Sequence, residues 1–178
     1  MIRRQLPAWS PLSAAGITRA TRWAAVDPGG SLEALTQVLG SHFAADRVIP
    51  TGSGTQALQL AIAAFAGEGA AGGRPVALPA WSCYDLVSAA VGARARVVFY
   101  DVDPTSLTPD PEGVRRALAR GCGALVAGSL FGFPLDWTWL RRECHAAGAT
   151  LVEDAAQAIG SSWRGADAGT QGDVTVLS

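Results

Sequence analysis

Residues 123–154, GALVAGSLFGFPLDWTWLRRECHAAGATLVED, contain two short apolar runs on either side of a longer, more polar segment. The runs at 123–128 and 149–153 have the length and composition of buried strands, whereas 136–148 has the length of a helix that ends at Gly148. A strand, a helix and a second strand in this order are typical of parallel strands joined by a crossover helix. This stretch therefore predicts a parallel sheet.

The same alternation extends over most of the chain. Further strands are expected at 47–50, 75–79, 95–103 and 173–178. Further helices are expected after a Ser31 cap, from near Gly54, at 84–92, and from Asp110 and Pro111 to about Arg120. The predicted fold class is α/β, with a mostly parallel sheet between two helical layers. Ligands of such sheets bind at the carboxyl ends of the strands.

The first part of the chain differs in composition from the rest. Residues 1–30 are rich in Pro, Gly, Arg and Trp and show no clear periodicity, so we expect an extended N-terminal arm there and the sheet domain at 31–178. Trp9 and Trp23 are too apolar to be left in water, and we expect the arm to pack on a second chain.

Composition excludes several classes of function. The chain is 49% hydrophobic and 16% charged with a net charge of −1, so neither nucleic acid nor a membrane surface is an expected partner. The start, MIRRQLPAWS, lacks the apolar segment of a signal peptide. Three widely spaced cysteines form neither a metal motif nor a disulfide framework. We expect a cytoplasmic protein without a metal site.

Lysine is absent from the whole sequence. The 14 basic residues are all arginines. Any mechanism that needs a lysine amine as nucleophile must therefore take it from outside these 178 residues.

Two motifs follow predicted strands in the way that ligand sites do. In TGSGTQAL (51–58), Ser53, Gly54 and Thr55 would form an anion site at the start of a helix; the alternative is an ordinary capped helix. Asp154, which ends the strand at 149–153, would pair with a heterocyclic cation; the alternative is a carboxylate that caps the next turn. The G-x-G-x-x-G pattern at 67–72 has a helix before it and a strand after it, the wrong order for a dinucleotide loop.

Together, the motifs resemble a known enzyme family. The matching stretches are GSGTQALQLAI, VALPAWSCYDLVSAAVGARARVVFYDVDPTSLTPDPEGVRRAL, LVEDAAQAIGSSWRG and GTQGDVTVLS. Their order is similar to that in fold-type I pyridoxal phosphate (PLP) enzymes, and most similar to the DegT/DnrJ/StrS-type nucleotide-sugar aminotransferases. The resemblance implies the three-layer large domain of that fold, here truncated before its final antiparallel strand and small C-terminal domain.

The resemblance also assigns roles around the cofactor ring. It implies that Asp154 pairs with the pyridine nitrogen and that Gln157 lies beside the phenolic oxygen. In the family an aromatic residue stacks on the ring at the position of Cys83, so stacking passes here to Trp81 or Tyr84, or is weaker.

The resemblance assigns the cofactor phosphate to two segments. Thr55 and the backbone N–H groups from Gly54 to Gln56 would bind it, and Ser178 would add a hydroxyl. The family's lysine follows the equivalent of Ser178 by five positions, beyond the last residue of this sequence. We therefore expect no catalytic residue within the chain and no covalent attachment of PLP.

The function implied by the resemblance is that of the N-terminal cofactor-binding part of a PLP-dependent aminotransferase. The full form would transfer an amino group from glutamate or glutamine to a keto-sugar nucleotide, as a homodimer or completed by a second polypeptide. One alternative is a non-catalytic remnant that binds a ligand or a partner. Another is a related PLP-dependent sugar dehydratase, which carries histidine in place of the lysine.

Overall fold

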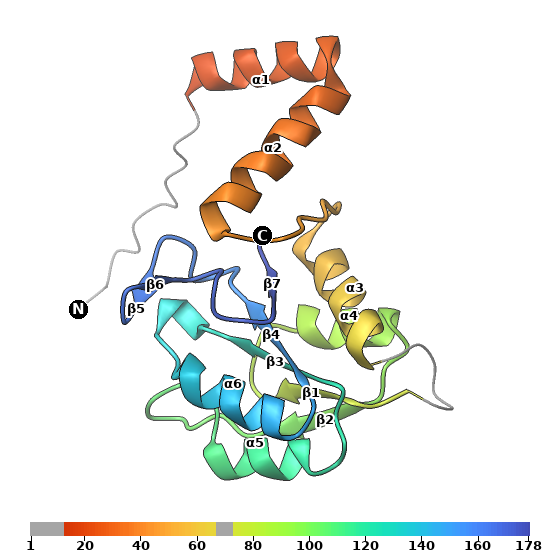
Figure 1. Ribbon diagram of the computed structural model, residues 1–178, viewed down its shortest axis with the longest axis vertical. Helices are drawn as coiled ribbons and strands as arrows, with labels where there is room; N and C mark the ends of the chain where they lie inside the picture. Colours follow the sequence, from red (N-terminus) through yellow and green to blue (C-terminus); the bar gives the residue numbers. More distant parts are fainter. Residues whose placement is uncertain (1–12, 67–72) are drawn as a thin grey trace, which may run out of the picture.

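A parallel five-stranded sheet forms the centre of the protein. The computed structural model describes residues 13–66 and 73–178 (Figure 1). The strand order is β2-β1-β3-β4-β7, and all neighbouring strands are parallel. The strands are β1 (Val76–Pro79), β2 (Val97–Tyr100), β3 (Ala124–Gly128), β4 (Thr150–Asp154) and β7 (Val174–Val176). A separate antiparallel hairpin pairs β5 (Ser162–Trp163) with β6 (Ala166–Asp167).

Helices cover both faces of the sheet. One layer contains α3 (Gly54–Ala66) and α4 (Asp85–Gly92), and the other contains α5 (Pro111–Leu118) and α6 (Trp137–Ala146). A single 3-10 turn, η1 (Leu130–Gly132), follows β3. The predicted three-layer α/β/α fold and its mostly parallel sheet are confirmed.

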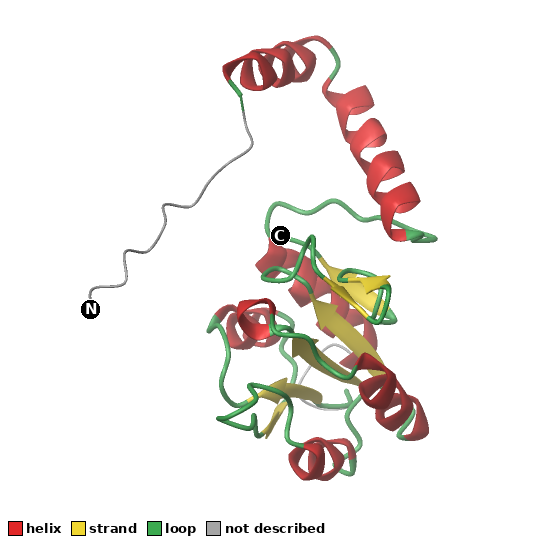
Figure 2. Cartoon of the chain, turned by 90° about the vertical axis from the view of Figure 1, so that its left-hand side faces the viewer, coloured by secondary structure: helices red, strands yellow, loops and turns green. Residues whose placement is uncertain are grey.

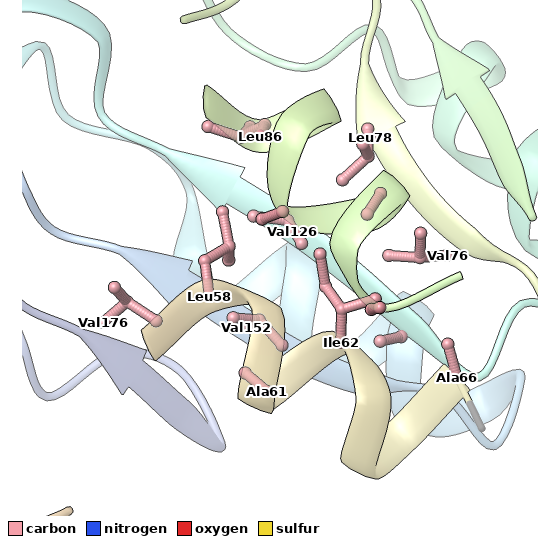
Figure 3. Close-up of a cluster of buried hydrophobic side chains, with 14 residues drawn as sticks. Leu58, Ala61, Ile62, Ala66, Val76, Leu78, Leu86, Val126, Val152 and Val176 are labelled. Carbon is pink, nitrogen blue, oxygen red and sulfur yellow. The ribbon is translucent and has the colours of Figure 1, made fainter. Parts of the chain in front are cut away.

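Two separate cores follow from the alternation of side chains along each strand. In β3, Ala124 and Val126 face α3 and α4, whereas Leu125 and Ala127 face α5 and α6. Figure 3 shows the first core, in which Ile62 of α3 lies among aliphatic side chains of the sheet. Because both faces are covered, β1 and β3 are apolar throughout, and this explains why they were recognisable in the sequence.

The prediction of an irregular arm at residues 1–30 is wrong for the part of it that the structure describes, which is helical. Residues Ala14–Val26 form the helix α1, and Pro28–Phe43 form α2. The side chain of Asp27 accepts a hydrogen bond from the Gly30 N–H at 2.8 Å, so Asp27 and not Ser31 caps α2. Asp27 and Pro28 repeat the Asp-Pro helix start that the sequence also shows at Asp110.

The helices α1 and α2 extend away from the sheet domain (Figure 2). α1 has no buried residue. The arm's first twelve residues, including Trp9, lie outside the described part of the chain. Within the described ranges, no helix is both long enough and apolar enough to cross a membrane.

The strand expected at 47–50 does not form. These residues connect α2 to α3 without regular secondary structure, after Ala44 ends α2 in the left-handed conformation. A strand needs a neighbour to satisfy its backbone groups, and the sheet places β7 on the far side of β4 from β3 without including 47–50. The glycine-rich pattern at 67–72 lies outside the described residues.

Arg74, which lies just before β1, connects this strand to the turns that follow α5 and α6. Its guanidinium donates to the carbonyl oxygens of Gly121 at 3.0 Å, Cys122 at 2.6 Å and Gly148 at 2.7 Å. These carbonyls follow α5 and α6, where the chain turns back into β3 and β4. One cation thus satisfies carbonyl groups in the turns that follow both helices.

We predict that Arg74→Ala lowers the free energy of unfolding by about 1–2 kcal/mol, because three charge-assisted hydrogen bonds are lost from a partly exposed site. Urea denaturation followed by circular dichroism measures this loss. The matched control is Arg120→Ala, since Arg120 is exposed and its side chain has no hydrogen bond or ion pair with the described residues. Equal losses for the two variants would contradict the prediction.

Candidate active site

A cavity of about 230 Å³ lies at the carboxyl edge of the sheet. It is lined by the starts of α3 and α4, the loops that follow β1, β2, β3 and β4, and the end of β7. Six of the seven residues predicted to contact the cofactor line it: Gly54, Thr55, Cys83, Asp154, Gln157 and Ser178. Asp154 and Thr55 thus lie at the same edge of the sheet.

Gln56 is the predicted residue that does not line the cavity. Its backbone N–H donates to the hydroxyl of Ser53 at 3.2 Å, and its side-chain oxygen accepts from the Gly52 N–H at 2.9 Å. Both groups are thus used to shape the turn before α3. In the described chain, the N–H groups of Gly54 and Thr55 have no hydrogen-bond partner, so these two remain available to an anion.

Gly54 allows the end of β7 to lie against the start of α3. A Cβ atom at position 54 would lie 2.7 Å from Ser178 Cβ and 2.9 Å from Ser178 Oγ. Only glycine therefore lets the Ser178 hydroxyl come this close to the first N–H groups of the helix. The helix dipole, these N–H groups and the nearby hydroxyls form one end of the cavity that favours negative charge.

Asp154 lines the same cavity from the carboxyl end of β4. One of its carboxylate oxygens accepts a hydrogen bond from the Ala156 N–H at 3.1 Å. Burial raises the pKa of this carboxyl above its usual value of 3.8, and the nearby charges of Asp85 and Glu153 raise it further against the lowering effect of the Ala156 N–H. In the neighbouring strand, a Cβ atom on Gly128 would lie 3.3 Å from Asp154 Cβ. Gly128 thus leaves room for the acid at this edge.

The side-chain amide of Gln157 has a defined orientation. Its oxygen accepts a hydrogen bond of 2.7 Å from the backbone N–H of Phe131, in the turn that follows β3. The amide nitrogen is then the atom left to donate to a ligand. Gln157 therefore presents a neutral donor beside the carboxylate of Asp154.

Ser82 and Cys83 of the loop after β1 reach the cavity, whereas Trp81 and Tyr84 are exposed and do not line it. The Cys83 thiol donates to a carboxylate oxygen of Asp85 at 3.3 Å. Sequence analysis missed Asp85, although it lies in the first turn of a helix that follows a strand, where acids are favoured. It also missed Ser129, a buried serine that directly follows β3 and lines the cavity.

The charges around the cavity are unbalanced. Asp85 and Asp154 both line it, and no arginine or histidine among the described residues does. Both acids share this cavity with the start of α3, which favours an anion. The arrangement therefore fits a ligand with a cationic heterocycle and an anionic tail, as the donor set of a pyridinium phosphate requires.

This three-layer fold, with its cavity at the carboxyl edge, is that of the large domain of fold-type I PLP-dependent transferases. The model of the DegT/DnrJ/EryC1/StrS aminotransferase family matches residues 14–178, and the chain belongs to this family.

Several known proteins are similar to the chain. It is 33% identical to an L-glutamine:2-deoxy-scyllo-inosose aminotransferase from Streptomyces kanamyceticus, over 91% of this chain and 38% of that protein. It is 34% identical to a GDP-perosamine synthase from Vibrio cholerae, over 71% of this chain and 34% of that protein. A solved structure from Streptococcus pneumoniae, described as a sugar aminotransferase in its PLP form, matches with a TM-score of 0.83 and 20% identity, over 94% of this chain and 46% of that one. The chain thus spans less than half the length of these relatives.

We predict that the stability of Asp154→Asn relative to the natural chain depends on pH. The raised pKa of Asp154 means that the folded chain binds this proton more readily than the unfolded chain, so ionisation of Asp154 at neutral pH costs stability. The variant should be the more stable at pH 7, and its advantage should shrink as the pH falls through the raised pKa towards 3.8. Thermal melting from pH 3.5 to 7.5 measures the difference. Asp167→Asn, in the exposed hairpin, is the control. A difference that stays constant across the range would mean that ionisation of Asp154 does not cost stability.

Proposed function

We propose that this chain is the cofactor-binding part of a PLP-dependent sugar aminotransferase. The observation that carries the proposal is the single cavity in which Asp154, Gln157 and Ser178 meet the start of α3. Membership of the aminotransferase family supports it independently. The PLP form of the pneumococcal structure supports the choice of cofactor.

In this proposal each residue has a defined task. Asp154 accepts a hydrogen bond from the protonated ring nitrogen and keeps the proton there, since an opposite charge reverses the pKa shift that burial causes. Gln157 donates to the phenolic oxygen. The N–H groups of Gly54 and Thr55, with the hydroxyls of Thr55 and Ser178, bind the phosphate. PLP itself supplies the electron sink for amino-group chemistry, and the chain supplies orientation and charge.

The substrates are proposed from the names of the relatives. The kanamyceticus protein is named for L-glutamine, which supports glutamine as the amino donor, with glutamate as the alternative. The relative from Vibrio cholerae is named as a synthase of GDP-perosamine, which supports a keto-sugar nucleotide as the acceptor. The same set of relatives favours 2-deoxy-scyllo-inosose as a second acceptor to test.

The proposed partner is a second copy of the chain or a second polypeptide. α1 and α2 expose a set of large apolar side chains: Ile17, Trp23, Val26, Leu32, Leu35 and Val38. Each such side chain contributes roughly 1.5–3 kcal/mol when it is buried, which favours association. Light scattering of the natural chain and of a Leu35→Glu variant tests this: we expect the substitution to shift the chain to a smaller species, and an unchanged mass would contradict the proposal.

Cofactor binding is the first test of function. Because residues 1–178 contain no lysine, we expect pyridoxamine phosphate and PLP to bind with dissociation constants within a few-fold of each other. Asp154→Asn should raise both dissociation constants at least tenfold, which corresponds to about 1.4 kcal/mol of binding free energy, because an amide cannot hold the ring proton as a carboxylate does. Isothermal titration calorimetry measures both constants. Asp167→Asn serves as the control, and failure of the natural chain to bind either compound would refute the cofactor site.

Amino transfer is tested separately by mass spectrometry. The chain is incubated with PLP, an amino donor, and either a nucleotide-linked keto-sugar or 2-deoxy-scyllo-inosose. Because residues 1–178 contain no lysine, we expect cofactor binding without an aminated product from this chain alone. An aminated product would contradict that expectation, and a sugar that loses water without gaining nitrogen would indicate a dehydratase.

A further inference from the structure

Glu153 is a buried carboxylate held entirely by uncharged donors. It is only 1% exposed. One oxygen accepts from the Gly169 N–H at 2.8 Å, and the other accepts from the N–H groups of Gln171 at 2.7 Å and Gly172 at 3.1 Å and from the Thr175 hydroxyl at 3.1 Å. No basic side chain of the described residues forms an ion pair with it. Four hydrogen bonds therefore compensate the cost of burying this acid.

Two glycines let the loop before β7 wrap around this carboxylate. Gly169 has a φ of +99°, a conformation that favours glycine, and a Cβ atom there would lie 2.5 Å from the ring of Phe43. A Cβ atom on Gly172 would lie 2.8 Å from the Glu153 nitrogen and 2.9 Å from its Cβ. The loop is therefore shaped to bring its N–H groups onto Glu153.

The loop leads directly into the strand that ends at the cavity. Thr175 pairs with Glu153 in the β4–β7 register, and the Ala155 N–H donates to the Val176 carbonyl at 3.0 Å. Two residues later, Ser178 lies against the first residue of α3. The position of the Ser178 hydroxyl is thus determined by where Glu153 holds the loop and β7.

Glu153 and Asp154 are neighbours in sequence but face opposite layers. Alternation along β4 places Glu153 with Leu151 on the side of α5 and α6, and Asp154 with Val152 on the side of α3 and α4. Glu153 does not line the cavity. Any effect on a ligand must therefore pass through β7.

We propose that Glu153 is a positioning residue for the cofactor phosphate, which acts by fixing the loop at 169–172 and, through β7, the Ser178 hydroxyl at the start of α3. This inference rests on the proposed cofactor function. It assigns to Glu153 a task at the phosphate end of the site, whereas a purely structural buried acid would affect all parts of the site alike.

The test compares two ligands that differ only in the phosphate. Glu153→Gln keeps the shape of the side chain, but whichever way its amide is turned, the nitrogen meets at least one backbone N–H that now bonds to the carboxylate. We expect Glu153→Gln to raise the dissociation constant of pyridoxamine phosphate at least tenfold and that of pyridoxamine less than twofold. Ser178→Ala should have the same selective effect, and the double variant should be no weaker than the worse single one, because both act on one contact. Equal losses for the two ligands, or additive losses, would overturn the proposal.

A second measurement does not need a ligand. Hydrogen exchange of the Ala155 and Val176 amides should accelerate in Glu153→Gln and, less strongly, in Thr175→Val, which removes one of the four hydrogen bonds. Amides of β3 should be unaffected, and Glu112→Gln on the exposed face of α5 is the control. Unchanged exchange at these amides would refute the role of Glu153. Failure of the natural chain to bind pyridoxamine phosphate would instead count against the cofactor function, and exchange alone would then decide whether Glu153 holds β7.

Discussion

The in-register pairing of β3, β4 and β7 is the constraint on which the candidate site depends. Gly128 is paired with Asp154, and Asp154 with Val176, so three parallel strands end at one level. A shift of one residue in β4 would turn Asp154 towards α5 and α6 and bring Glu153 to the cavity. The register therefore decides which of two adjacent acids meets a ligand.

The two acids illustrate how one strand creates opposite electrostatic environments. The donors around Glu153 are supplied by its own chain, and its charge is compensated within the fold. Asp154 has a single backbone donor and two carboxylate neighbours, so burial leaves its charge poorly compensated. A cation that enters the cavity would stabilise the poorly compensated charge of Asp154. The carboxylate is already held in place by the fold, so a cationic ligand would not have to order it on binding.

Much of this arrangement could be predicted from the sequence because the physical signals were local. The apolar runs of β1, β3 and β4 are continuous since both of their faces are buried, and Asp110 with Pro111 marks the start of α5. Asp154 was identified from its place at a strand end, whereas Ser178 was assigned through the resemblance to the aminotransferase family. The errors at 47–50 and in α1 have a different origin. A short apolar run predicts a strand whether or not a partner strand is available. The helix α1 lacks the buried face that produces a recognisable periodicity. Neither Asp85 nor the four donors on Glu153 could be assigned, because their positions depend on loops brought together by the fold.

The short β7 has a consequence for local stability. This strand contains three residues and lies at the end of the sheet order, with β4 as its one partner among the described strands. The part of the cavity beside Asp154 rests on β4, which is paired on both sides. Strands with few pairs open more often than strands paired on both sides. Among the described strands, the part of the cavity beside Ser178 therefore rests on the less protected strand and the part beside Asp154 on the more protected one. One cavity thus joins two strands that differ in how often they open.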